Sequence, residues 1–356
     1  LNHRYAVYHG PKGLRTIAEH VHGKANVFSA QVKELGYKTG DAPYFDTVRV
    51  ELAKGTSAEF QQLAVKNGVN VRALDNKTVT ISVDETTTKD DLAALLNVFA
   101  QANGKSANLA DKLEKAQTTN TIPANFHRTS AYLTHPVFNS YHSEHEMLRY
   151  IFRLHNKDLG LVHSMIPLGS CTMKLNATAE MIPITWPEFN SIHPFVPLNQ
   201  TEGYQKMFND LERQLADITG FHSVSLQPNA GSQGEYAGLL SIRKYQKAHN
   251  QGHRDIVLIP VSAHGTNPAS AMMLGLQVVP VNCDEEGNIE VADLKAKAEK
   301  HKDKLSCIMI TYPSTHGVFE GSVKEICKIV HDNGGQVYMD GANMNAQVGL
   351  TKPGKR

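Results

Sequence analysis

The sequence lacks the features that mark membrane, secreted and nucleic-acid-binding proteins. None of its apolar runs approaches the roughly 20 residues that a membrane helix needs, and its first residues lack the basic, apolar and small regions of a signal peptide. The formal net charge is only +1, which favours neither nucleic acid nor an anionic membrane as partner. With 41% hydrophobic residues, the 356-residue chain is expected to fold as a soluble globular protein of two or more domains.

Cysteine is also scarce, and an initiator Met is absent. The cysteines are far apart and have neither the spacing of a metal site nor that of a disulfide framework; they are Cys171, Cys283, Cys307 and Cys327. This usage fits a reducing compartment and predicts no metal centre. Because the first residues already lead into an amphipathic helix, we expect the natural N-terminus to lie upstream.

The residues that are present divide the chain into three parts. Residues 1–118 mix helical and strand patterns, including a helix that Thr88 caps, and predict a small α+β domain. Residues 119–202 contain Pro, His and aromatic residues in irregular order, which is typical of an arm over a surface. Residues 203–356 alternate strands and helices, which is typical of a mostly parallel sheet covered on both faces. The strand-like runs of this part are 223–226, 255–261, 276–281, 305–312 and 336–339.

A glycine-containing segment, residues 229–235, follows the first of these strand-like runs and opens a helix. Its glycines let backbone N–H groups approach a ligand, so the segment is a candidate anion site. An ordinary tight turn is the alternative. The segment has neither the phosphate-loop motif nor the glycine spacing of a dinucleotide site, which disfavours a nucleotide ligand.

Two further candidates follow strands of the same sheet, where ligands of open α/β sheets bind. His264 comes after the 255–261 strand, and small neighbours such as Ala263 and Gly265 leave room for a planar ring against its imidazole. A packed structural histidine is the alternative. Residues 311–317 emerge at the same edge, so that their hydroxyls and imidazole are candidates for contact with a substrate or a ring oxygen.

A carboxylate, Asp340, stands just past the apolar strand 336–339. A buried carboxylate is costly unless a donor or a cation faces it. A pyridinium N–H would serve, and a protonated pyridine ring is what makes pyridoxal phosphate an electron sink. A turn or capping role is the alternative for Asp340. Four such motifs at strand ends in one sheet together favour a pyridoxal phosphate site.

Several long runs resemble the glycine cleavage system P-protein family, pyridoxal-phosphate enzymes of the aspartate-aminotransferase-like fold (fold type I). The likeness covers the whole chain: residues 1 to about 118 resemble the small domain that ends the family's first half, and the remainder resembles the opening of its C-terminal, active-site half. The runs that carry the resemblance are 141–144, 164–176, 183–186, 234–238, 262–271, 310–317 and 340–349.

The resemblance implies roles for individual residues. Gly231, Ser232 and Gln233 are expected near the cofactor phosphate, with His264 stacked on the ring. Asp340 is expected to pair with the pyridine nitrogen, with Ala342 beside it at the cofactor. The expected catalytic residues are His264, Thr315 and His316, and the expected border of the active-site entrance is formed by His142, Ser170, Cys171 and Lys174.

The resemblance also implies an activity. In this family glycine loses its carboxylate as carbon dioxide, and the remaining aminomethyl group is transferred to the lipoyl arm of H-protein. We expect a dimer of P-protein chains or halves, in the cytoplasm of a bacterium or in the mitochondrial matrix of a eukaryote.

One departure from the family pattern concerns the lysine that bonds the cofactor covalently. In the family it lies downstream of the run that corresponds to residues 345–349, whereas this sequence ends at Arg356. Neither Lys352 nor Lys355 is proposed as a substitute, so the chain by itself is expected to be inactive. The alternatives are another fold type I pyridoxal-phosphate enzyme, such as an aminotransferase or a cysteine desulfurase, a non-catalytic fragment and, more distantly, a nucleotide-binding Rossmann module.

Overall fold

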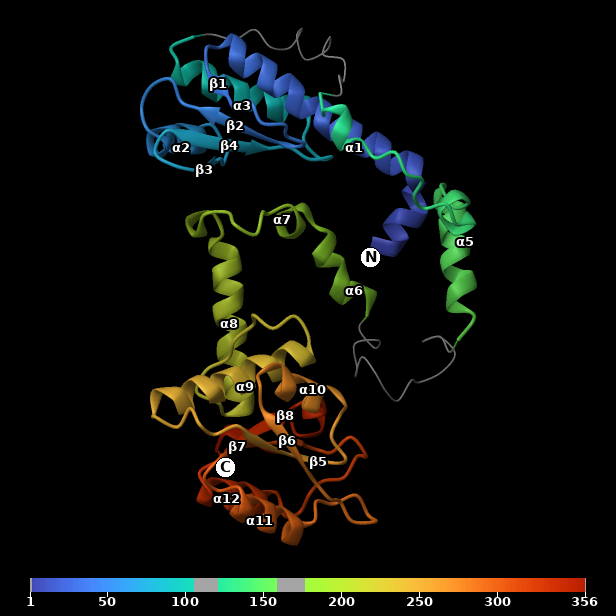
Figure 1. Ribbon diagram of the computed structural model, residues 1–356, viewed down its shortest axis with the longest axis vertical. Coiled ribbons are helices and arrows are strands. Elements are labelled where there is room, and N and C mark those ends of the chain that lie inside the picture. Colours follow the sequence, from blue (N-terminus) through green and yellow to red (C-terminus); the bar gives the residue numbers. More distant parts are fainter. Residues whose placement is uncertain (1, 106–120, 159–176, 356) are drawn as a thin grey trace. The chain divides into compact units, whose positions relative to one another are not determined.

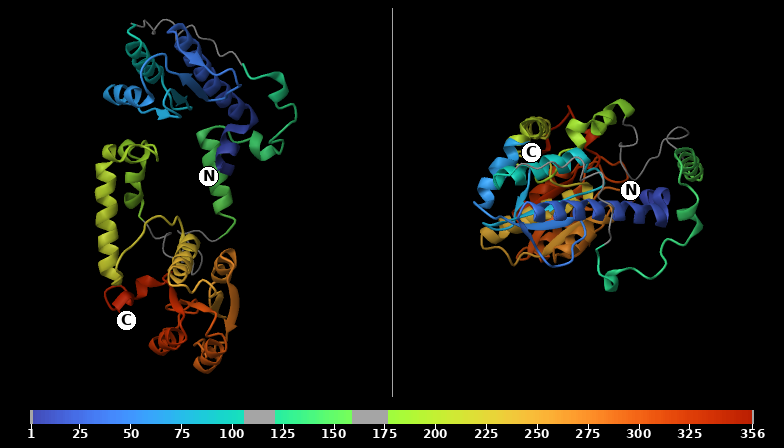
Figure 2. Two further views of the ribbon diagram at one scale, coloured as in Figure 1. Left: turned by 60° about the vertical axis from the view of Figure 1, so that its left-hand side comes forward. Right: turned by 90° about the horizontal axis from the view of Figure 1, so that it is seen from above.

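The structure, a computed structural model, describes residues 2–105, 121–158 and 177–355. It divides into two compact units, Leu1–Ile166 and Pro167–Arg356. Figure 1 labels their elements, and Figure 2 shows the same elements from two further directions. Each unit is described by itself. No helix in the described ranges is long and apolar enough to cross a membrane.

The first unit begins with a four-stranded antiparallel sheet and three helices. The strands lie in the order β1-β2-β4-β3. The elements are α1 (Asn2–Glu34), β1 (Lys38–Thr39), β2 (Thr47–Glu51), α2 (Ser57–Lys66), β3 (Arg72–Ala73), β4 (Thr78–Ser82) and α3 (Lys89–Ala102). The small α+β unit expected from the sequence is therefore present, and α1 is interrupted at Gly10, where φ is 62°. The boundary expected near residue 118 lies outside the described residues.

Helix α3 begins where the sequence predicts, because Thr88 and Asp91 cap each other. The Thr88 hydroxyl accepts a hydrogen bond from the Asp91 backbone N–H at 3.1 Å. In return the Asp91 carboxylate accepts the Thr88 backbone N–H at 2.7 Å. This capping box satisfies two N–H groups that the first turn of a helix leaves without partners.

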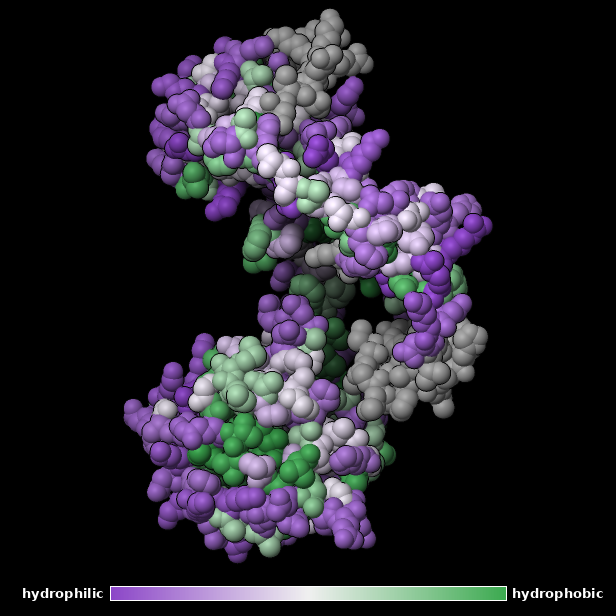
Figure 3. Space-filling view, turned by 45° about the vertical axis from the view of Figure 1, so that its right-hand side comes forward, coloured by the Kyte–Doolittle hydropathy of each residue, from purple (hydrophilic) through white to green (hydrophobic). Residues whose placement is uncertain are grey.

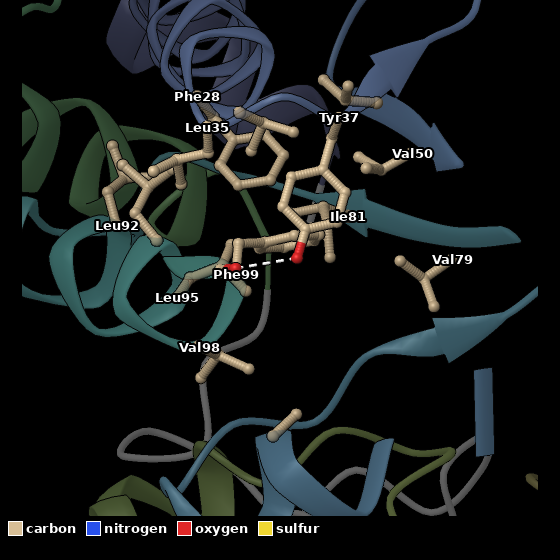
Figure 4. Packing of buried hydrophobic residues seen from close by; sticks show 14 of the residues in the cluster. Phe28, Leu35, Tyr37, Val50, Val79, Ile81, Leu92, Leu95, Val98 and Phe99 are labelled. Atoms are coloured by element: carbon tan, nitrogen blue, oxygen red, sulfur yellow. Dashed lines mark hydrogen bonds between the residues drawn. The ribbon is translucent and has the colours of Figure 1, made fainter. Parts of the chain in front are cut away.

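The core of this unit lies between one face of the sheet and the helices. Strand β2 alternates exposed residues with the buried Val48 and Val50, so one face of the sheet is buried. Phe99 of α3 is fully buried against three aromatic rings, those of Phe28, Tyr37 and Phe60, with centroid distances of 5.6, 5.1 and 4.5 Å. The Tyr37 hydroxyl donates to the Phe99 carbonyl oxygen at 2.8 Å, which ties the edge of the core to α3 (Figure 4).

Residues 121–158 run along α1. They include the short 3₁₀ helices η1 (Ala124–Phe126) and η2 (Pro136–Asn139) and the helix α5 (Glu144–His155). The Tyr132 hydroxyl donates to the Pro11 carbonyl at 2.7 Å, and His142 Nδ1 donates to the Tyr8 carbonyl at 2.7 Å. Residues 121–158, one described part of the expected arm, therefore contact α1 within the first unit.

The second unit contains a parallel sheet in the order β6-β5-β7-β8. The strands are β5 (Ile256–Pro260), β6 (Gln277–Val281), β7 (Leu305–Thr311) and β8 (Gln336–Asp340). The longer helices are α8 (Glu202–Thr219), α9 (Gly231–Ala248), α10 (Thr266–Met273), α11 (Val291–Lys300) and α12 (Val323–Asp332). Shorter elements are α6 (Thr178–Met181), η4 (Ile182–Thr185), α7 (Pro187–Asn190), η5 (Leu198–Gln200), η6 (Met344–Ala346) and η7 (Pro353–Lys355).

Helices cover both faces of this sheet, as Figure 1 shows: α9 and α10 pack on one face, α11 and α12 on the other. Strand side chains alternate between the two cores, because successive residues of a strand point to opposite faces. Val257 and Met309 pack in the cluster on the α9 and α10 side. Leu258 and Ile308 pack in the cluster on the α11 and α12 side. The α/β organisation expected of the pyridoxal-phosphate-dependent transferase-like fold is confirmed.

One expected strand is absent. Residues 223–226 alternate polar and apolar side chains, but they form no strand in the structure. They lie largely exposed and pair with no named strand, and a segment this short needs a neighbouring strand to be stable. The expectation of a strand before α9 was therefore wrong, whereas the helix itself is confirmed.

Large apolar side chains also remain exposed on the second unit, and Figure 3 shows a group of apolar side chains on one of its faces. On α8 the apolar residues Met207, Leu211 and Ile218, which recur at helical spacing, are each more than a third exposed. Residues 202–219 therefore form the helix that their periodicity predicts, but no residue of this helix is buried.

Candidate functional site

Three strand ends meet at one edge of the second unit's sheet. Strands β5, β7 and β8 are parallel neighbours, so their carboxyl ends lie side by side. The segments that follow them contain His264, residues 312–317 and residues 341–347. Helix α9 packs on β7, β8 and α10. The structure therefore gathers the candidate segments at one edge, as parallel strands require.

Asp340, the last residue of β8, is the carboxylate of this edge. Its side chain is 9% exposed. Oδ1 accepts the Ala342 backbone N–H at 2.9 Å, and Oδ2 accepts from Asn267 Nδ2 at 3.3 Å. Both donors are neutral, so the carboxylate keeps acceptor capacity for a cationic donor. Asn267 is itself fully buried, and its Oδ1 is a buried oxygen with no hydrogen-bond partner among the described residues.

The loops after β7 and β8 are tied together by side-chain amides. Gln347, which is 2% exposed, donates from Nε2 to the Tyr312 carbonyl at 2.7 Å. Asn343 Nδ2 donates to the Pro313 carbonyl at 2.9 Å. These bonds fix the two loops relative to each other. Thr315 and His316 stand exposed in the first of them.

The first turn of α9 is open to solvent. Gly231, Ser232 and Gln233 are exposed, and Ala230 before them provides no side-chain cap. Backbone N–H groups in the first turn of a helix have no intrahelical acceptor, and the helix dipole favours an anion there. This turn has the donors that a phosphate group needs.

A second buried carboxylate, Glu235, was not among the residues predicted from the sequence. It is 5% exposed on α9. Its Oε1 accepts from the Thr266 hydroxyl at 2.6 Å and its Oε2 from the Ser270 hydroxyl at 2.8 Å. The Thr266 hydroxyl also lies 2.8 Å from Nδ1 of the exposed His264. The signal in the sequence was a pair of hydroxyl residues four apart in a helix of small residues, which places both on one face.

Tyr338 of β8 packs on α9 at Gly238. Burial raises the pKa of Tyr338, and the charges of Asp340 and Glu235 raise it further. The phenol therefore stays neutral in the ordinary pH range. Its ring packs so closely on Gly238 that a Cβ atom there would lie 2.4 Å from Cε2. Glycine at this position lets α9 approach the sheet.

A small cavity lies beneath the loops at this edge. Its volume is about 20 Å³, and its polar lining includes Ser262, Thr311, Ser314 and Glu320. The Thr311 hydroxyl is buried there without a hydrogen-bond partner in the described part of the chain. A cavity of this size and polarity has room for about one water molecule.

The remaining predicted residues lie elsewhere. His142 belongs to the first unit, where its ring contacts α1 at Gly10. Ser170, Cys171 and Lys174 lie outside the described residues. Lys352 Nζ forms an ion pair with an Asp217 carboxylate oxygen of α8 at 2.8 Å. Among the residues with described positions, no group of three or more His, Cys, Asp or Glu side chains is arranged to hold a metal ion.

Two family descriptions match parts of the chain. Residues 1–99 match the family described as glycine cleavage system P-protein. Residues 199–353 match the family described as beta-eliminating lyase.

Relatives of high identity match nearly all of the chain. The mitochondrial glycine dehydrogenase (decarboxylating) of Dictyostelium discoideum is 58% identical over 353 residues, which are 98% of this chain and 35% of that protein. The enzyme of that name from Nostoc punctiforme is 57% identical over 353 residues, 98% of this chain and 36% of that protein. The mitochondrial one of Pisum sativum is 56% identical over 350 residues, 98% of this chain and 33% of that protein. The chain thus spans about a third of the length of these curated relatives.

Solved structures match at lower identity. The crystal structure of glycine decarboxylase (P-protein) of the glycine cleavage system, in inhibitor-bound form, covers 71% of this chain and 52% of that chain, with a TM-score of 0.49 and 14% identity.

Proposed function

We propose that this chain, which belongs to the glycine cleavage system P-protein family, forms part of a pyridoxal-phosphate-dependent glycine decarboxylase. The observation that supports this most directly is the buried carboxylate of Asp340, held by two neutral donors at the end of β8. The relatives that match 98% of the chain are named glycine dehydrogenase (decarboxylating). Because the chain spans about a third of their length, the activity is proposed for the protein that contains it.

The residues at this edge of the sheet fit pyridoxal phosphate. When bound, the cofactor supplies an electron sink for the charge that develops at the substrate α-carbon. The Asp340 carboxylate would hold a protonated pyridine nitrogen, because a buried anion is stabilised by a cationic donor. The N–H groups of Gly231, Ser232 and Gln233 would hold the phosphate, and the imidazole of His264 would lie against the ring.

The chain's own groups have distinct tasks in this proposal. Ala342 N–H and Asn267 Nδ2 orient the Asp340 carboxylate and keep it from rotating. Thr315 and His316, exposed in the loop that Asn343 and Gln347 anchor, would contact the substrate side. The His316 imidazole would hold or move a proton on that side. Residues 142, 170, 171 and 174 would border the entrance.

The products and partners follow from the family. Glycine would lose carbon dioxide, and the aminomethyl group would pass to the lipoyl arm of H-protein. The protein would act as a dimer of P-protein chains or halves, in the bacterial cytoplasm or the mitochondrial matrix. We retain residues 1–118, 119–202 and 203–356 as proposed small domain, arm and cofactor-binding domain.

The test is glycine-dependent exchange of labelled bicarbonate by the protein that contains this chain, in the presence of lipoylated H-protein and pyridoxal phosphate. Exchange that needs both glycine and lipoylated H-protein is expected. The comparison variant is Asp340→Asn, which keeps the shape of the side chain and removes the charge proposed to hold the cofactor; it is expected to lose exchange activity.

A second candidate is another fold type I pyridoxal-phosphate enzyme, which the match of residues 199–353 to the beta-eliminating lyase family favours. Transamination or β-elimination of an amino acid without any bicarbonate exchange would refute glycine decarboxylation and support this candidate.

A further inference from the structure

Hydrogen bonds connect Glu235, a buried residue of α9, through the Thr266 hydroxyl to the exposed ring of His264. Glu235 is buried and accepts a hydrogen bond from the Thr266 hydroxyl at 2.6 Å. The same hydroxyl oxygen lies 2.8 Å from His264 Nδ1. A second hydroxyl, that of Ser270, donates to the other Glu235 oxygen at 2.8 Å. Because Glu235 has a donor on each oxygen, it is held in one orientation.

The direction of these bonds depends on which protons the Glu235 carboxylate, the Thr266 hydroxyl and the His264 imidazole carry. An ionised carboxylate only accepts hydrogen bonds, and a hydroxyl has a single proton to donate. If Thr266 donates its proton to Glu235, its oxygen faces His264 only as an acceptor. The nitrogen at 2.8 Å, Nδ1, must then carry a proton, and the neutral ring has its free lone pair on Nε2.

One contact opposes this arrangement. The Thr266 backbone N–H lies 3.2 Å from the same Nδ1 and would donate to it if the nitrogen carried no proton. Both tautomers leave the Thr266 hydroxyl free to donate to Glu235, so they differ only in the two contacts at Nδ1. A protonated Nδ1 donates to the hydroxyl oxygen at 2.8 Å, whereas an unprotonated Nδ1 would face a lone pair of that oxygen and gain only the 3.2 Å bond from the backbone N–H. The shorter contact therefore favours a protonated Nδ1.

We infer that Glu235, acting through the Thr266 hydroxyl, is a positioning residue that keeps the neutral His264 ring protonated on Nδ1 and leaves Nε2 as an acceptor. This state of the ring is inferred from the contacts among Glu235, Thr266 and His264 alone. Its consequence rests on the proposed function: an imidazole held against the cofactor would present Nε2, and not an N–H, at its outer edge. The same bonds fix the plane of a ring that is otherwise exposed.

The experiment measures the ¹⁵N chemical shifts of the His264 ring, which differ strongly between a protonated and an unprotonated nitrogen. The 356-residue chain is labelled with ¹⁵N-histidine and studied at mildly alkaline pH, where an exposed histidine is neutral. His264→Gln identifies the signals. The wild-type chain is expected to show protonated Nδ1.

Thr266→Val removes the hydroxyl while it keeps the shape of the side chain and the backbone N–H. It is expected to reverse the ring to protonated Nε2, with a change in the ratio of the two forms of roughly tenfold or more. Thr266→Ser is expected to restore the wild-type form. Ser270→Ala, which removes the hydroxyl that does not touch His264, is the matched control and keeps the wild-type form.

Glu235→Leu tests the carboxylate itself and is expected to reverse the ring as Thr266→Val does, because the freed hydroxyl proton then turns to Nδ1. Should this variant not fold, the Thr266 pair still decides the matter. Protonated Nε2 in the wild type, or an unchanged ring in Thr266→Val, would overturn the inference. Absent bicarbonate exchange together with the expected reversal would instead refute the proposed function alone.

Discussion

Replacement of Gly238 by alanine should push α9 away from the sheet and destabilise the second unit. The ring of Tyr338 occupies the space that a side chain at position 238 needs, and a Cβ atom would lie 2.4 Å from Cε2 and 2.7 Å from Cδ2. Unbonded carbon atoms approach to about 3.5–4.0 Å. The helix or the ring must therefore move by roughly 1 Å, and the ring is confined because it packs on the core beneath α9.

Two effects of opposite sign determine the result. Overpacking in a close-packed core costs about 1–3 kcal/mol. Alanine is favoured over glycine inside a helix by at most about 1 kcal/mol. With the full helix gain the net loss is about 0–2 kcal/mol, which lowers the melting temperature of a unit of this size by up to roughly 8 °C.

Thermal unfolding followed by circular dichroism measures the difference. Gly234→Ala is the matched control, because it lies in the same helix and a Cβ atom there has no neighbour within 4 Å. This control should be neutral or more stable than the wild type. In a Tyr338→Ala background the penalty of Gly238→Ala should disappear, since the two sites are in contact. If both alanine substitutions stabilised the protein equally, the Tyr338 ring would move aside without cost, and the reasoning about overpacking would be refuted.

Three further outcomes are expected. Phe99→Ala should destabilise the first unit by roughly 3–5 kcal/mol in urea unfolding, because it removes a fully buried ring that three others contact. Thr88→Ala should cost about 1 kcal/mol at neutral pH. Hydrogen bonds from the Thr88 backbone and then from its hydroxyl lower the pKa of Asp91. The ionised carboxylate therefore stabilises the fold at pH values above the ordinary pKa of an aspartate, and this stabilisation is lost as the pH falls. The loss of stability caused by Thr88→Ala should accordingly be smaller when unfolding is measured below about pH 4. Asp340→Asn should weaken pyridoxal phosphate binding roughly hundredfold by absorbance titration, because one partner of a buried charged pair is lost; unchanged affinity would exclude Asp340 as the pyridine partner.

The sequence was most informative where local pattern and burial agree. The strands β5 and β7 were predicted because runs of apolar residues such as 256–259 and 307–310 suit strands that are covered on both faces. The start of α3 was predicted because Thr88 and Asp91 form their cap within four residues. Asp340 was found because it ends such an apolar strand.

The sequence was least informative where the outcome depends on distant segments. The run 223–226 has the alternation of a strand, yet no neighbour pairs with it. Glu235 was missed because its partners, Thr266 and Ser270, lie 31 and 35 residues away and meet it only through the packing of α9 on α10. The requirement for glycine at position 238 likewise arises from a residue on β8.

The buried carboxylates of Glu235 and Asp340 differ in how well the protein satisfies their oxygens. Glu235 accepts two hydroxyl protons at 2.6 and 2.8 Å, so short bonds to side chains satisfy both of its oxygens. Asp340 accepts one backbone N–H at 2.9 Å and one longer amide bond at 3.3 Å, and no ion pair to it is found in the described residues. A buried carboxylate with weak, neutral donors has a large desolvation cost that a cationic donor would offset. This asymmetry supports the proposal that Asp340 faces the ligand and that Glu235 orients groups within the protein.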